Sequence, residues 1–180
     1  MKFVIDKTAL LVVDLQEKLL PAMHDHERVL ARSLVMLKCA KALGVGVVTT
    51  QQYPRGLGET VKVVRDELEP NDVIIDKTRF SACTDKVMGV IESGGYKSVL
   101  VMGVEAHVCV MQSCLDLKAA GYHVGVVVDA IGSRNPLDWD TGIARFQQRG
   151  IELMTVESAV FELVGDAKAE GFKKVLPLIQ

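Results

Sequence analysis

The stretch SVLVMGVEAHVCV, residues 98–110, begins as an unbroken apolar run and changes character at Gly103. A short apolar run without polar alternation is typical of a strand that is covered on both faces of its sheet. The segment Gly-Val-Glu-Ala-His then interrupts the run, and Cys109 comes two residues after His107. Cys109 is therefore either a small buried side chain of the core or a nucleophile at the end of a strand.

Five other runs of the same kind are separated by segments with helical spacing. The runs are TALLVVD (8–14), VGVVTT (45–50), DVIIDK (72–77), HVGVVVD (123–129) and IELMTV (151–156). The spacing predicts helices over 27–43, 84–93, 108–120 and 137–148, a last helix from near Glu157, a polar tail from Asp166, and longer loops over 51–60 and 130–140.

Alternation of strands and helices predicts a parallel sheet with right-handed crossovers. We therefore expect an α/β protein with three α/β/α layers. Its six-stranded, mostly parallel sheet should be Rossmann-like, in the order 3-2-1-4-5-6, and residues 1–180 should form a single domain.

The composition excludes several classes of protein. The chain has 180 residues, of which 49% are hydrophobic, so one large core can be built. The net charge of -2, the 5% aromatic content and the absence of a basic stripe argue against nucleic acid as a partner. No apolar run is long enough to span a bilayer, and the first residues lack the features of a signal peptide, so we expect no membrane partner. The four cysteines have neither zinc nor CxxC spacing, which favours a reduced, cytoplasmic setting.

Three reactive side chains lie at or just after the ends of predicted strands. They are Asp14, Lys77 and Cys109. Each has an ordinary structural alternative, since Asp14 could cap a turn, Lys77 could be solvated and Cys109 could be core. Ligands of open parallel sheets bind beyond the carboxyl ends of the strands, so the coincidence of all three favours a functional site there.

The chemistry of these three groups is coherent. A thiol attacks as its thiolate, and a nearby ammonium and a helix N-terminus both lower the pKa of a thiol. We expect Lys77 and the first turn of the 108–120 helix to activate Cys109, and Asp14 to take the thiol proton. Backbone N–H groups of the preceding turn would hold an oxyanion. This arrangement predicts acyl transfer through a thioester, with a small amide, carbamoyl or related C–N compound as the substrate.

Four motifs carry a family resemblance: LLVVDLQ (10–16), IDKTRFSAC (75–83), VMGVEAHVCV (101–110) and DAIGSR (129–134). Over roughly residues 8–158 the chain resembles the isochorismatase-like (cysteine hydrolase) superfamily, and most of all its isochorismatase domain-containing proteins of undefined substrate. The resemblance implies a catalytic triad of Asp14, Lys77 and Cys109. It also implies a cis peptide bond between Val104 and Glu105. The backbone N–H groups of this turn, including those of Val108 and Cys109, would then face the oxyanion.

The chain departs from two branches of this superfamily. Nicotinamidases carry an Asp-x-His metal motif after the second strand, where this chain reads TTQQYPRGLG (49–58) and has no histidine. We therefore expect neither a metal nor another cofactor. Isochorismatases lack the cysteine, so the presence of Cys109 argues against vinyl-ether hydrolysis.

Five further residues are candidates for the substrate pocket: Gln16, Gln52, Tyr53, Phe80 and His107. Their alternatives are an ordinary turn at Gln52 and Tyr53, core packing for Phe80, and a packed, hydrogen-bonded state for His107.

Two other functions stay open at this point. One is ether or ester hydrolysis on the same fold. The other is a non-catalytic or redox protein in which Cys83 and Cys109 form a thiol pair. The apolar C-terminal segment FKKVLPLIQ (172–180) and the resemblance together predict a homo-oligomer.

Overall fold

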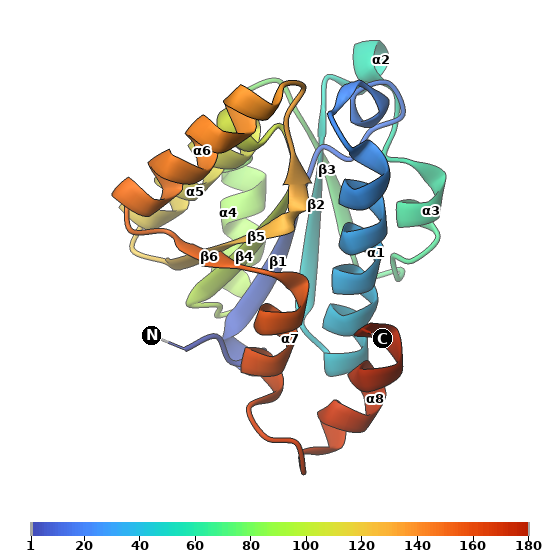
Figure 1. The fold of residues 1–180 in the computed structure, drawn as a ribbon, viewed down its shortest axis with the longest axis vertical. Helices are drawn as coiled ribbons and strands as arrows, with labels where there is room; N and C mark the ends of the chain where they lie inside the picture. Colours follow the sequence, from blue (N-terminus) through green and yellow to red (C-terminus); the bar gives the residue numbers. More distant parts are fainter. Residues whose placement is uncertain (1, 180) are drawn as a thin grey trace.

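The computed structural model describes residues 2–179, which form one six-stranded, all-parallel sheet flanked by helices (Figure 1). The strand order is β3-β2-β1-β4-β5-β6, so the predicted α/β class and order are confirmed. The strands are β1 (Thr8–Val13), β2 (Gly46–Gln52), β3 (Val73–Lys77), β4 (Ser98–Val104), β5 (His123–Gly132) and β6 (Glu152–Met154).

Helices cover both faces of the sheet. On one face α1 packs with α7 and α8, and on the other face lie α4, α5 and α6 (Figure 1). Two short helices, α2 and α3, lie between β2 and β3. The helices are α1 (His26–Leu43), α2 (Pro54–Leu57), α3 (Lys62–Arg65), α4 (Asp85–Ser93), α5 (Met111–Ala119), α6 (Pro136–Gln148), α7 (Val156–Val164) and α8 (Glu170–Ile179). None of these described helices has the length and apolar character needed to cross a membrane.

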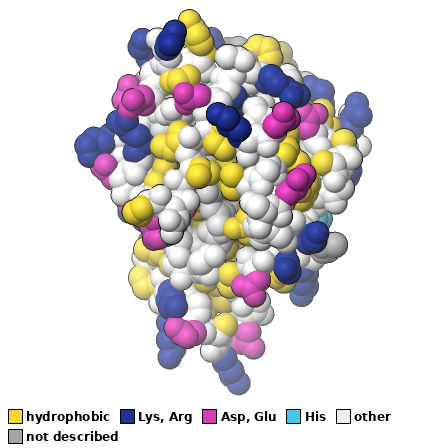
Figure 2. Space-filling model, turned by 180° about the vertical axis from the view of Figure 1, so that it is seen from behind, with side chains coloured by type: hydrophobic (Ala, Val, Ile, Leu, Met, Phe, Trp, Pro, Cys, Tyr) yellow, Lys and Arg dark blue, Asp and Glu magenta, His cyan; other side chains and the backbone are white. Residues whose placement is uncertain are grey.

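The apolar runs of the sequence are the central strands of the sheet. All six residues of β1 are buried, because helices cover both of its faces. Leu10 and Val12 pack into the cluster beneath α1, whereas Leu11 and Val13 pack into the cluster beneath α4 and α5. On the face shown in Figure 2, basic and acidic side chains are interspersed, with hydrophobic side chains between them.

The end of β5 differs from the predicted loop. Residues 130–132 extend the strand, so only residues 133–135 separate β5 from α6. The pairing of β5 with β4 shifts register between Val101 and Gly103, where Gly103 lies opposite Ile131. An irregularity of this kind inserts extra residues into one strand, and the hydrophobic pattern alone does not reveal it.

Two helical segments also differ from expectation. The helix predicted from residue 108 begins earlier, as a π-helical turn over Ala106–Val110, and continues as α5. The predicted polar tail contains α8, which packs against α1 and buries Val175. The charged residues of α8, which are Glu170, Lys173 and Lys174, are exposed, whereas its apolar residue Val175 is buried.

Gly103 allows β4 to approach β1 closely at the edge that carries the site. Its φ is 115°, and a Cβ atom there would lie 2.0 Å from the carbonyl oxygen of Val13. Only glycine fits this conformation and this contact without moving backbone.

We predict that Gly103→Ala lowers the free energy of unfolding by more than about 3 kcal/mol, because it combines backbone strain with a clash. Gly89→Ala is the matched control, since Gly89 lies inside α4 with open space around it. That control should gain about 0.5–1 kcal/mol, because alanine favours the helix. Urea unfolding measures both changes. Equal stability of the two variants would contradict the requirement for glycine at position 103.

Candidate active site

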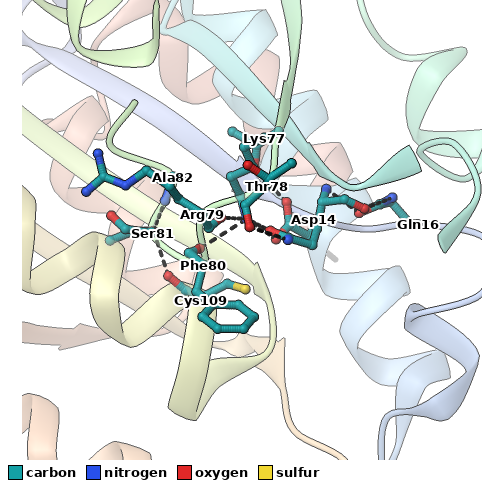
Figure 3. A network of polar contacts seen from close by, with 12 residues as sticks. Asp14, Gln16, Lys77, Thr78, Arg79, Phe80, Ser81, Ala82 and Cys109 are labelled. Carbon is teal, nitrogen blue, oxygen red and sulfur yellow. Dashed lines mark hydrogen bonds and ion pairs between the residues drawn. The ribbon is translucent and has the colours of Figure 1, made fainter. Parts of the chain in front are cut away.

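The structure brings Asp14, Lys77 and Cys109 together at the carboxyl edge of the sheet (Figure 3). Asp14 follows β1, Lys77 ends β3, and Cys109 lies in the π-helical turn after β4. All three side chains are buried. The Nζ atom of Lys77 lies 2.6 Å from Oδ2 of Asp14, so the acid and the ammonium form a direct ion pair inside the protein.

Asp14 is fixed by its backbone and by β2. Its φ of 53° is left-handed, a conformation that aspartate tolerates better than most residues. The N–H of Asp14 donates to the carbonyl of Thr50 at 3.2 Å, and the Thr50 hydroxyl donates to Oδ1 of Asp14 at 2.8 Å. One carboxylate oxygen is thus held by Thr50 and the other by Lys77.

The Lys77 ammonium is surrounded by oxygen acceptors. A buried ammonium is tolerable only when its charge is paired and its N–H groups are hydrogen-bonded. The acceptors are Asp14 Oδ2 at 2.6 Å, Gln52 Oε1 at 2.8 Å, Phe80 O at 3.0 Å and Arg79 O at 3.2 Å. This set of protein acceptors fixes the position of the ammonium.

The side chains of Gln16 and Gln52 connect backbone segments next to the Asp14–Lys77 pair. The Gln16 amide donates to the carbonyls of Gln52 and Gly58 at 2.9 and 2.7 Å and accepts from the Gln52 N–H at 2.7 Å. The Gln52 amide donates to the carbonyl of Thr78 at 2.8 Å. Gln16 is fully buried, so its predicted place in the substrate pocket is corrected to a support of the loop after β2.

The turn around Cys109 has an unusual backbone. The peptide bond between Val104 and Glu105 is cis, at the position that the resemblance implies. The N–H groups of Val108 and Val110 both donate to the carbonyl of Glu105 at 3.1 Å. The N–H of Val108 is therefore already used within the turn and is not free for an oxyanion, contrary to expectation. The N–H of Glu105 instead lies near the Cys109 thiol, where it lowers the thiol pKa.

The thiol of Cys109 is not a preformed thiolate. Burial, then the negative charge of Asp14, raise its pKa to about 12, and the hydrogen bond to Asp14 adds to the rise. The Lys77 ammonium and the N–H of Glu105 lower the pKa, but their effect is smaller. The expected lowering of the thiol pKa is therefore wrong, because burial and the negative charge of Asp14 outweigh the effect of Lys77.

The carboxyl of Asp14 is also shifted. Burial raises its pKa above the ordinary range, against the opposing effects of Lys77, Thr50 and Cys109. A carboxylate that is held next to a protonated thiol, with its own affinity for protons increased, is suited to act as a general base.

The other candidates for the substrate pocket are either exposed at the surface or packed against other side chains. Tyr53 and Phe80 are 55% and 56% exposed, so Phe80 does not belong to the core and both are available at the surface. His107 is packed, with Nδ1 3.0 Å from the hydroxyl of Ser133. Arg134 donates to the carboxylate of Glu105 at 3.2 Å.

Thr50 is the clearest residue of the site that sequence reasoning missed. It pairs with Val13 in the register of β1 and β2, so its side chain reaches the carboxylate of the next residue, Asp14. The signal was present, because Thr50 is a hydroxyl residue near the end of a predicted strand beside β1.

Known proteins show which family the chain belongs to. The Isochorismatase domain family model matches residues 8–158. Isochorismatase family protein 1A of Dictyostelium discoideum is 37% identical over 175 residues, which cover 95% of this chain and 85% of the relative.

Two solved structures are similar along nearly the whole chain. MAR1 ribonuclease from Caenorhabditis elegans has a TM-score of 0.96 and 35% identity, with 99% of this chain and 92% of that chain covered. YcaC from Pseudomonas aeruginosa, solved with hexane-2,5-diol and covalent acrylamide, has a TM-score of 0.91 and 26% identity, with 98% and 91% covered. The fold, the family model and the relatives together place this chain in the isochorismatase family.

Proposed function

We propose that this protein is a cysteine hydrolase that cleaves an amide, carbamoyl or related C–N bond of a small molecule through a thioester. The observation that carries the proposal is the buried Asp14–Lys77 ion pair beside the Cys109 thiol. Such a pair supplies a base that is fixed in position and a nucleophile that needs one. The family consists of hydrolases, which agrees with this class of reaction.

The proposed first step forms one bond and breaks another. The Cys109 thiol gives its proton to the Asp14 carboxylate while the sulfur attacks the carbonyl carbon. The oxyanion that develops is held by backbone N–H groups of the turn after the cis peptide bond other than those of Glu105 and Val108. The C–N bond then breaks, the proton on Asp14 passes to the leaving nitrogen, and a thioester of Cys109 is left.

Water completes the cycle in the second step. Asp14, again a carboxylate, takes a proton from water, which attacks the thioester carbonyl. The C–S bond breaks, the proton returns to the sulfur, and a carboxylic or carbamic acid leaves. Lys77 holds the Asp14 carboxylate in place through their ion pair.

Metal independence is supported by the residues that stand where nicotinamidases carry their metal motif. The Gln51 amide donates to Oδ1 of Asp76 at 3.0 Å and accepts from the N–H of Thr60 at 2.6 Å. Gln52 is committed to Lys77 and Thr78. These neutral amides are occupied by protein partners, and amides are poor ligands for the divalent metals that histidine binds.

Covalent acrylamide in YcaC supports a nucleophile of the proposed kind. Acrylamide is both an amide and an electrophile, so it resembles the proposed substrates and reports a reactive atom. The bound molecule belongs to that relative, and it makes acrylamide a suitable probe for this protein.

A second candidate is cleavage of RNA, because MAR1 ribonuclease is a near structural relative. The specific observation in its favour is a cavity of about 560 Å³ beside Lys77 that Arg55, Arg79 and Lys86 line. Within residues 2–179 these three cations form no ion pair. Asp76 and Asp85 share the cavity and offset much of the charge, so amide hydrolysis stays the better-supported proposal.

The remaining proposals concern setting and assembly. All four cysteines are free, as expected in a reducing, cytoplasmic compartment. We also propose a homo-oligomer, because Tyr53, Phe80 and Leu137 are large apolar side chains that stay exposed in the single chain. Light scattering after gel filtration tests the assembly, and a monomeric mass would contradict it.

We predict that acrylamide adds one adduct per chain, at Cys109, and that Cys109→Ala abolishes it. Cys83→Ala is the matched control, because burial raises the pKa of the Cys83 thiol to about 11 but that thiol has no Asp–Lys pair. Intact-mass and peptide spectra measure the adduct. An adduct that persists in the Cys109 variant would remove the proposed nucleophile.

The same variant tests the competing reactions. With a panel of amides and carbamoyl compounds, Cys109→Ala should lose roughly 10³-fold or more in kcat/KM. Turnover of isochorismate or RNA that survives in Cys109→Ala would favour ether or phosphodiester hydrolysis. A Cys83–Cys109 disulfide under mild oxidation, without turnover of any compound, would favour the redox alternative.

We predict that Asp14→Asn slows alkylation of Cys109 about 10²-fold at pH 7, because asparagine cannot take the thiol proton. In the unaltered protein the rate should fall with acid through a pKa above the ordinary carboxyl range, since burial raises the pKa of Asp14. The variant should lose this acid limb. Faster alkylation of Asp14→Asn at neutral pH would show instead that Asp14 only raises the thiol pKa.

A further inference from the structure

Ser113 is a buried hydroxyl residue that connects two segments of the site. It lies on α5, four residues after Cys109, and is fully buried. Its hydroxyl donates to the carbonyl of Cys109 at 2.6 Å and accepts from the N–H of Ala82 at 2.7 Å. One oxygen atom therefore joins the backbone of the nucleophile to the loop after β3.

That loop is the one that surrounds the Lys77 ammonium. The carbonyls of Arg79 and Phe80 accept from Nζ of Lys77, and Ala82 follows two residues later (Figure 3). A shift of Ala82 would therefore move two of the four acceptors of Lys77. Through Ser113, the same shift is tied to the backbone of Cys109.

The first of these bonds alone would be unremarkable. Serines inside helices often donate to the carbonyl four residues earlier, with no further role. The bond from Ala82 is different, because its donor comes from another segment of the chain and would otherwise be a buried, unpaired N–H group. The hydroxyl thus holds together two catalytic segments that no strand pairing connects.

We propose that Ser113 is a positioning residue that fixes the sulfur of Cys109 relative to the Asp14–Lys77 pair. This inference rests on the proposed roles of those three residues. Ser113 touches no reacting atom and acts only through the two backbone groups that it joins. Its effect should appear in proton transfer from the thiol, which needs the donor and the acceptor at hydrogen-bonding distance.

The test compares Ser113→Ala with the pair Ser113→Thr and Ser113→Val. Threonine and valine have the same shape, and only threonine keeps the hydroxyl, so this pair separates the hydrogen bonds from packing. Ser33→Ala is the matched control, since Ser33 is a fully buried helical serine of α1 whose hydroxyl donates to the carbonyl of Ala130, away from the triad.

The readout is the rate of acrylamide addition to Cys109 as a function of pH. Ser113→Ala and Ser113→Val should be about 10-fold slower than the unaltered protein at pH 7, as expected for a small misplacement of reacting groups. The difference should shrink as the pH rises towards the thiol pKa of about 12, because hydroxide then makes the thiolate without Asp14. Ser113→Thr should keep the original pH profile, and Ser33→Ala should change only the melting temperature.

Several results would overturn the proposal. An unchanged pH profile in Ser113→Ala would do so. Faster addition at every pH would also do so, because it reports a loosened structure that exposes the thiol. A protein that folds only when the hydroxyl is kept would show a structural role instead. Failure of the proposed function is distinct from these, because the adduct would then be absent from Cys109 in the unaltered protein.

Discussion

The ion pair between Asp14 and Lys77 is the interaction on which the rest of the site depends. Two charges removed from water are stable only when each is paired and its remaining hydrogen-bonding groups are filled. The surrounding groups meet that condition. Thr50 donates a hydrogen bond to the second carboxylate oxygen of Asp14. The side chain of Gln52 and the carbonyls of Arg79 and Phe80 accept hydrogen bonds from the ammonium. The arrangement fixes a paired carboxylate beside the Cys109 thiol, which differs from a thiol that faces a free ammonium.

Most of the fold could be predicted from the sequence. Nearly continuous apolar runs indicate strands with both faces covered, and their alternation with helices leaves few topologies. The details that escaped prediction depend on contacts between distant segments. The extension of β5 follows from its pairing with β4, and α8 is a helix because one side of it packs on α1.

The sequence predicts which three side chains come together, but it does not predict how their charges pair. Strand ends share one edge of a parallel sheet, so Asp14, Lys77 and Cys109 could be placed together from sequence. Whether the Lys77 ammonium pairs with Asp14 or with Cys109 depends on distances of a few ångströms, and the sequence does not specify such distances. The same limit applies to Gln16, for which the sequence predicts a substrate contact and whose amide instead forms hydrogen bonds with backbone groups.

Strand β3, which carries Lys77, is an edge strand and is paired along one side only, with β2. Edge elements open more readily than central ones, and amide hydrogen exchange reports that opening. The ion pair spans two strands that are not neighbours, since β2 lies between β1 and β3. It therefore ties the edge to the centre of the sheet. Opening of β3 would therefore also separate Lys77 from Asp14, and amide hydrogen exchange at β3 would report the loss of this ion pair.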